Sequence, residues 1–151
     1  KIYMIPRKIK KILVPYDGSP CSKHAFKMAL DLAHKYNSNL IVLSCIEKLN
    51  GSWFGLDFSP GYEKEVQKHK KVIQKEIDKL EKDSKNMQVP FSSEIFTTDS
   101  TVKQILSFTK NKRVDLIVMG SHRRTGVEKL VLGSIANGVV QKSKIPVMII
   151  R

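Results

Sequence analysis

The chain has 151 residues, 41% of them hydrophobic, and no apolar run approaches the roughly 20 residues that a membrane-spanning helix needs. Two cysteines are too few for a disulfide framework, and residues 1–8 lack the apolar core of a signal peptide, so we expect a reducing, cytoplasmic setting. The 27 Lys and Arg against 14 Asp and Glu give a net charge of +13, which favours anionic partners; we do not expect nucleic acid among them, because no aromatic platform or known binding module accompanies the charge.

Strands and helices alternate in the first half of the chain. Ser19 followed by Pro20 supplies an N-cap and a proline at the first helical position, where its missing N–H costs nothing. Apolar residues then recur every three or four positions up to Tyr36, as in an amphipathic helix. A nearly continuous apolar run follows, which is typical of a strand covered on both faces. In order, a strand, a helix, a strand and a long surface helix are expected over residues 9–15, 20–36, 40–46 and 62–85.

A long loop is expected between the second strand and the long helix. Residues 47–61 hold three aromatic residues, Trp53, Phe54 and Phe58, and a loop of this length is uncommon in a compact domain. It is typical either of a lid over a ligand or of a contact surface for another subunit, and both interpretations stay open.

The second half of the chain continues the alternation. Thr101 with Gln104 three residues later resembles a capping box at the start of a helix. The apolar stripe of that helix is expected to consist of Val102, Ile105, Leu106 and Thr109. In order, a strand, this helix, a strand, a helix and a last strand are expected over residues 89–96, 101–109, 115–119, 133–142 and 146–150.

The complete β-α-β-α-β-α-β-α-β order predicts one domain over residues 1–151. Strictly alternating elements with apolar strands indicate a doubly wound α/β fold, a five-stranded parallel sheet with helices on both faces and right-handed crossovers. In Rossmann-like sheets of this kind a ligand binds beyond the carboxyl ends of the strands, where the strand order reverses. The first and fourth strands are the candidates to flank that point.

The stretch from Gly120 to Ser134, G-S-H-R-R-T-G-V-E-K-L-V-L-G-S, has the composition of a phosphate-holding loop. It leads from a buried strand into a helix. Glycine lets the backbone approach an anion, and the free N–H groups at a helix start carry a partial positive charge. The familiar G-x-x-x-x-G-K-[ST] and G-x-G-x-x-G patterns are absent from the sequence.

Three further residues lie at predicted strand ends. Asp17 either accepts hydrogen bonds from a ribose or caps the helix that follows it. Cys45 and Met119 either offer polarizable surface to a purine or belong to the core. The residues alone leave these pairs of alternatives open.

The chain resembles the universal stress protein family over nearly its whole length, from residues 10–19 through 115–122 to 146–151. ATP-binding members of that family carry a glycine, two residues, a second glycine, nine residues, and then a glycine with Ser or Thr. Gly120, Gly133 and Ser134 match this pattern at the right spacing, whereas Arg123 stands in place of the second glycine.

The resemblance implies a stress-response protein that binds ATP, ADP or AMP as a regulatory ligand, with Mg²⁺ as a candidate companion of the phosphates. No catalytic residue and no protein metal site is expected, and any ATP hydrolysis would be slow. The implied nucleotide-binding residues are Pro15, Asp17, Cys45, Met119, Gly120, His122, Arg123, Gly133, Ser134 and Ile135.

Arg123 allows two interpretations. If the family glycine serves a positive φ or a close backbone approach, an arginine costs on the order of 1 kcal/mol or more and narrows the pocket. If the backbone is tolerant, the guanidinium pairs with the phosphates. We favour retained nucleotide binding; the alternatives are a family member that has lost it and acts through protein contacts, and a weak ATPase.

The last predicted strand has no charge in its middle and no element after it, which is typical of an unpaired sheet edge. Pairing with its own copy about a two-fold axis would satisfy its backbone groups. Universal stress proteins commonly dimerise through this strand, so the resemblance implies a homodimer through residues 147–150.

Overall fold

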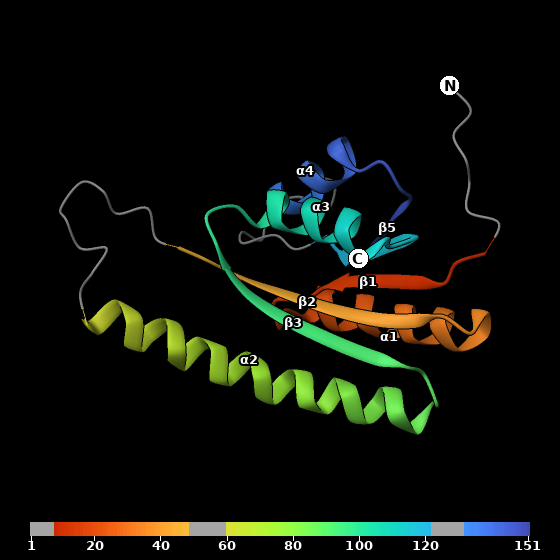
Figure 1. Ribbon diagram of the computed structural model, residues 1–151, viewed down its shortest axis with the longest axis horizontal. Helices are drawn as coiled ribbons and strands as arrows, with labels where there is room; N and C mark the ends of the chain where they lie inside the picture. Colours follow the sequence, from red (N-terminus) through yellow and green to blue (C-terminus); the bar gives the residue numbers. More distant parts are fainter. Residues whose placement is uncertain (1–7, 49–59, 122–131) are drawn as a thin grey trace.

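The computed structural model describes residues 8–48, 60–121 and 132–151 (Figure 1). The expected alternation of strands and helices is confirmed. The aromatic residues of the predicted 47–61 loop, Trp53, Phe54 and Phe58, lie outside the described residues. The elements are β1 (Lys11–Pro15), α1 (Pro20–Tyr36), β2 (Asn39–Glu47), α2 (Pro60–Asn86), β3 (Phe91–Thr98), α3 (Thr101–Lys112), β4 (Leu116–Gly120), α4 (Ser134–Lys142) and β5 (Val147–Ile150).

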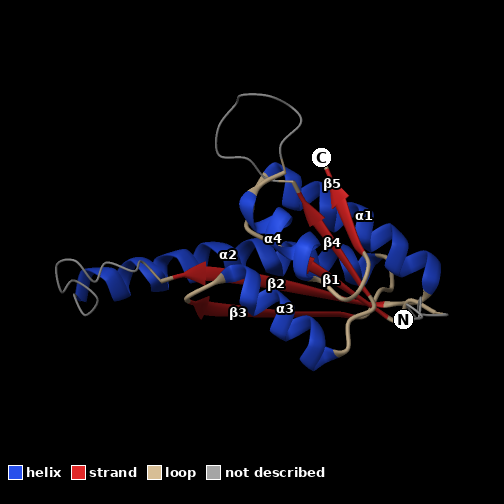
Figure 2. Cartoon of the chain, turned by 90° about the horizontal axis from the view of Figure 1, so that it is seen from above, coloured by secondary structure: helices blue, strands red, loops and turns tan. Residues whose placement is uncertain are grey.

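All five strands are parallel and lie in the order β3-β2-β1-β4-β5. The strand order therefore reverses between β1 and β4, as expected from the sequence. Ile12 of β1 pairs with Leu40 of β2 on one side and with Leu116 of β4 on the other. Figure 2 shows the resulting twisted sheet, whose parallel strands fan out toward their carboxyl ends.

Helices cover both faces of the sheet (Figure 1). One face packs against α1 and α2 through a core that includes Ile12, Val14, Phe26 and Ile77. The other face packs against α3 and α4 through a core that includes Leu13, Leu43, Ile105, Phe108 and Val139. Alternate residues of β1 thus enter opposite cores, which explains its continuous apolar sequence and confirms the doubly wound α/β fold.

The limits of α1 follow from its caps. The Ser19 side chain accepts a hydrogen bond from the Ser22 N–H at 3.2 Å, with Pro20 in the first turn, as the sequence predicted. Asn37 ends the helix in the left-handed conformation, at φ 53°.

The predicted capping box at Thr101 and Gln104 is wrong. The N-cap of α3 is Ser100, whose hydroxyl accepts from the Lys103 N–H at 3.3 Å. A serine at the preceding position competes for the same role, and it has the extended backbone that a cap requires. The buried stripe of α3 also differs, because Phe108 joins Ile105 and Thr109 in it, whereas Leu106 is only half-buried.

The predicted limits of β3 are also wrong: the strand begins two residues later than expected, at Phe91, and ends at Thr98. Gln88 is left-handed, and the Val89 N–H donates to the Ser84 carbonyl, so both residues close the end of α2. Val89 is buried in the core on the α1 and α2 side without belonging to a strand, so its apolar side chain led to the wrong prediction.

Smaller shifts have equally local causes. Asp115 precedes β4 instead of starting it, because its carboxylate accepts from the Lys10 and Lys11 N–H groups at 2.8 and 2.9 Å. Gly133 is the N-cap of α4 rather than its first residue. Within the parts of the chain that the structure describes, no helix is both long and apolar enough to cross a membrane.

Candidate functional site

One cavity of about 680 Å³ lies at the carboxyl ends of β1, β2 and β4, where the strand order reverses. Its volume falls within the range of roughly 300–1,000 Å³ that small-molecule sites occupy. The starts of α1, α3 and α4 complete the wall. The lining residues are Pro15, Tyr16, Asp17, Ser19, Ser22, Leu43, Cys45, Glu47, Thr101, Val102, Ile105, Met119, Gly120, Leu132, Gly133, Ser134, Ile135 and Ala136.

The turn after β1 carries Asp17 to the cavity. Its Oδ1 atom accepts from the Ser19 N–H at 2.9 Å, while the Ser19 hydroxyl caps α1. Between them Gly18 has φ +80°, a conformation that a side chain would strain. The N-cap of α1 is therefore Ser19 and not Asp17, and the Asp17 side chain stabilises the turn before the helix.

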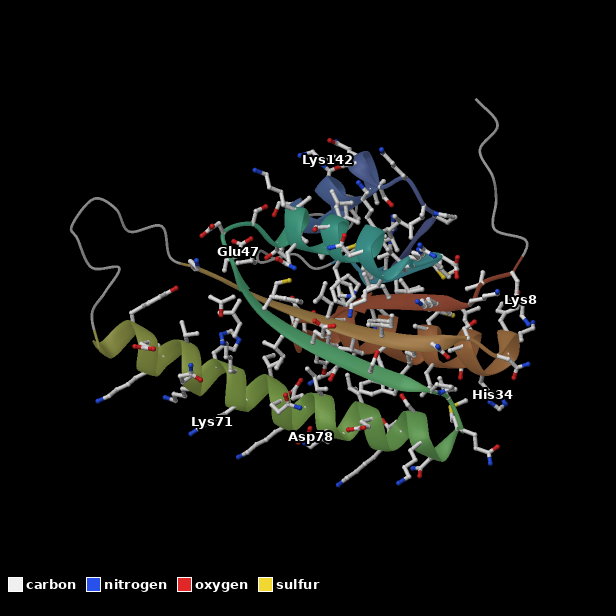
Figure 3. All side chains as sticks on the ribbon, in the orientation of Figure 1. Lys8, His34, Glu47, Lys71, Asp78 and Lys142 are labelled. Atoms are coloured by element: carbon white, nitrogen blue, oxygen red, sulfur yellow. The ribbon has the colours of Figure 1, made fainter. Side chains whose placement is uncertain are left out.

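The end of β2 contributes Cys45 and Glu47, which lie on the same side of the strand because side chains alternate. Burial, and secondarily the Glu47 carboxylate, raises the pKa of the Cys45 thiol to about 12. This thiol stays protonated at neutral pH and presents polarizable apolar surface. Glu47 Oε1 accepts from the Thr101 N–H at 2.9 Å, so Glu47 ties β2 to the start of α3 (Figure 3).

The end of β4 contributes Met119, which is buried, and Gly120. A Cβ atom on Gly120 would lie 2.7 Å from both the carbonyl carbon and the Cβ of Cys21 in α1. Real Cβ atoms do not come this close to backbone. Glycine is thus needed here for packing against α1, independently of any ligand.

The first turn of α4 forms the remaining wall through Ser134, Ile135 and Ala136. Its N-cap is Gly133, and no side chain of the described residues makes a cap hydrogen bond there. A helix start without a side-chain cap keeps N–H groups and a partial positive charge available to an anion.

Eight of the ten residues that the sequence assigned to nucleotide binding therefore line one cavity. The other two, His122 and Arg123, lie outside the described residues. Among the described residues that line the cavity, only Asp17 and Glu47 carry a formal charge. The described part of the chain contains no group of three His, Cys, Asp or Glu side chains placed to hold a metal ion.

Sequence reasoning missed other lining residues. The alternation of strand side chains would have found Glu47, which lies two positions after Cys45. Val102 and Ile105 could not be found in this way, because the spacing of residues in the sequence does not fix how α3 is oriented against β2.

A model of the universal stress protein family matches residues 8–151. The chain belongs to the universal stress protein family. The universal stress protein MJ0531 of Methanocaldococcus jannaschii is 28% identical over 142 residues, which cover 94% of this chain and 82% of that relative. The solved structure of universal stress protein UspA from Lactobacillus plantarum superposes with a TM-score of 0.85 at 22% identity, covering 95% of this chain and 99% of its own.

Two other universal stress protein structures contain a nucleotide. One is in complex with cAMP, with a TM-score of 0.69 and 19% identity over 94% of this chain and 97% of its own. The other, from Archaeoglobus fulgidus, is in complex with dAMP, with a TM-score of 0.65 and 15% identity over 94% and 98%. At these identities the solved structures establish the Rossmann-like fold that this chain shares with them.

Proposed function

We propose that this universal stress protein binds an adenine nucleotide, ATP, ADP or AMP, in the cavity as a regulatory ligand in a stress response. The observation that carries the proposal is the convergence of Asp17, Cys45, Met119 and the Gly133–Ile135 segment on one cavity at the strand-order reversal. The cAMP and dAMP complexes of other universal stress proteins support the choice of an adenine ligand.

The residues of the cavity wall suggest where the purine, the ribose and the phosphates of the nucleotide bind. The purine lies between the Cys45 and Met119 side and the apolar residues Val102 and Ile105 of α3. Asp17 accepts hydrogen bonds from the ribose hydroxyls, as carboxylates do with sugar. The start of α4, at Ser134, points its first-turn N–H groups to the phosphates.

Phosphate charge needs compensation, because Asp17 and Glu47 give the described wall a formal charge of −2. The α4 terminus supplies part of it. His122 and Arg123, assigned from the sequence, supply the rest, and for ATP we include Mg²⁺ beside the phosphates. The setting we propose is the cytoplasm.

We include a homodimer through β5 in this proposal. In the described sheet β5 is an edge strand, paired only with β4. Its residue Met148 is 36% exposed, an apolar side chain on an unpaired edge. A second copy joined there about a two-fold axis would cover both the edge and the side chain.

Titration calorimetry with ATP, ADP and AMP tests the binding proposal. Asp17→Asn keeps the acceptor for the Ser19 N–H but removes the charge, and we expect it to weaken AMP binding about tenfold, since hydrogen bonds to charged groups contribute roughly 1.5–3 kcal/mol. Asp31→Asn, an exposed aspartate of α1, is the matched control and leaves the affinity unchanged.

Two outcomes would replace this proposal. No heat with any of the three nucleotides, at submillimolar protein, would favour a family member that acts through protein contacts, with Arg123 as the sequence feature behind the loss. Steady release of phosphate from ATP that Gly133→Ala abolishes would favour an ATPase instead of a binding module.

A further inference from the structure

We infer that Tyr16 and Glu76 form a positioning pair that holds Asp17 for the ribose from the opposite face of the sheet. The inference rests on the proposed nucleotide binding at Asp17. Tyr16 lines the cavity together with its neighbours Pro15 and Asp17, and its buried ring belongs to the core on the α1 and α2 side.

Tyr16 is 4% exposed, and its hydroxyl donates to Glu76 Oε2 at 2.7 Å. A phenol buried this far needs a partner, and Glu76 of α2 provides one. Burial, and then the hydrogen bond to Glu76, raises the pKa of Tyr16 above its ordinary value of 10.0. The hydroxyl therefore stays protonated and keeps donating under all neutral conditions.

Glu76 also lies beside the turn that carries Asp17. Its Oε2 atom would be 3.1 Å from a Cβ added to Gly18, and its Oε1 atom is 3.4 Å from the Lys23 ammonium of α1. One carboxylate thus binds Tyr16 after β1 and Lys23 of the following helix, and it lies next to the turn between them. A side chain at Gly18 would be strained by the positive φ and would crowd the Glu76 carboxylate.

The backbone of Tyr16 is fixed separately. Its N–H donates to the Leu43 carbonyl at 2.8 Å, and its carbonyl accepts from the Ser44 hydroxyl at 2.6 Å. These bonds hold Tyr16 to β2 but do not reach the turn. Within the turn, the Ser19 N–H donates to Asp17 Oδ1. Glu76 lies against the turn at Gly18, and the Tyr16 hydroxyl keeps the Glu76 carboxylate in place.

A binding group held before the ligand arrives loses less freedom on binding, so a loosened Asp17 contributes less affinity. The loss should appear only for ligands that Asp17 holds, that is, for nucleotides with ribose hydroxyls. A general defect of folding would instead weaken all nucleotides alike. This difference separates positioning from structural support.

The experiment compares AMP with 2′,3′-dideoxy-AMP by titration calorimetry. We expect wild type to bind AMP more tightly than dideoxy-AMP. Tyr16→Phe should lose about fivefold in AMP affinity, the scale of one hydrogen bond, whereas its affinity for dideoxy-AMP should equal that of wild type. Tyr36→Phe, the same change at an exposed tyrosine of α1, is the matched control and alters neither affinity.

Changes at Glu76 test the pair from its other side. Glu76→Gln retains an oxygen acceptor and should keep most of the AMP affinity, whereas Glu76→Ala should lose as much as Tyr16→Phe. The double variant Tyr16→Phe with Glu76→Ala should lose no more than either single variant, because both remove one interaction. The Glu76 side chain is 30% exposed, so we expect its variants to remain folded even if Tyr16→Phe does not.

Equal losses for AMP and dideoxy-AMP, or no loss for either, would overturn the positioning pair while leaving nucleotide binding intact. Failure of wild type to bind AMP would remove the proposed function, and this inference with it. The two failures are therefore distinguishable in the same titration series.

Discussion

Gly120 lies where β4 packs tightly against α1. A methyl group there would lie 2.7 Å from backbone and Cβ atoms of Cys21, which cannot move without displacing α1. We expect Gly120→Ala to lower the free energy of unfolding by about 1–3 kcal/mol, the usual cost of overpacking. Urea unfolding monitored by circular dichroism measures this cost.

Gly138→Ala is the matched control for that substitution. Its methyl group would meet a side-chain methyl, Val102 Cγ2, at 2.9 Å, and alanine inside α4 gains up to about 1 kcal/mol of helix propensity. Its net loss should be clearly smaller. If both variants lost the same free energy of unfolding, the close approach of Gly120 to the Cys21 backbone would not explain the cost of Gly120→Ala.

The Cys45 thiol should make the free energy of unfolding depend on pH in the alkaline range. Its folded pKa of about 12 lies above the ordinary 9.0, so the unfolded chain releases the thiol proton first as the pH rises. The stabilisation is complete below pH 9 and is lost between pH 9 and about 12, with a slope of at most about 1.4 kcal/mol per pH unit.

The free energy of unfolding should therefore fall more steeply above pH 9 for wild type than for Cys45→Ala, which has no thiol to titrate. Below pH 8 the two pH profiles should run parallel. Urea unfolding at a series of pH values makes the comparison, and parallel profiles up to pH 11 would contradict the raised pKa.

At the scale of elements, α3 has two candidate N-caps, Ser100 and Thr101, which substitutions can tell apart. Ser100→Ala should cost about 1 kcal/mol, because the Lys103 N–H loses its acceptor. Thr101→Ala should cost less than about 0.5 kcal/mol, since the hydrogen bond from Thr101 to Glu47 uses its backbone N–H. Thermal unfolding of both variants decides, and a larger cost at Thr101 would restore the capping box.

The elements also show how much of the site could be predicted from the sequence. Asp17, Cys45 and Met119 were predictable because each lies at a strand end, and parallel strands bring their carboxyl ends to one edge. Val102 and Ile105 were not, because the orientation of α3 depends on packing against β2 and α4. The Tyr16–Glu76 contact, 60 positions apart, has no pattern in the sequence at all.

At the scale of the whole molecule, the proposed homodimer places Met148 of β5 at its interface. Light scattering at micromolar concentration should give about twice the 17.2 kDa of one chain. Met148→Lys should give a monomer, whereas Met28→Lys, at a comparably exposed methionine of α1, should stay dimeric. A monomeric wild type, or the same mass for both variants, would contradict an interface at β5.

At the scale of the whole molecule, the positive charge also gathers on α2, whose lysines are not among the residues that line the cavity. Lysines 64, 68, 71, 75, 79 and 82 follow helical spacing along α2 and are all exposed. Figure 3 shows Lys71 and Asp78 on the side of α2 that faces away from the sheet. We interpret this as a solvated helix face, so a nucleotide should leave it undisturbed.

Titration of isotope-labelled protein with AMP, followed by amide chemical shifts, tests the location of the nucleotide most directly. We predict shifts at the four segments around the cavity, near Asp17, Cys45, Gly120 and Ser134, and none along the lysines of α2. Shifts confined to α2, or no shifts at millimolar AMP, would contradict a nucleotide site at the strand-order reversal.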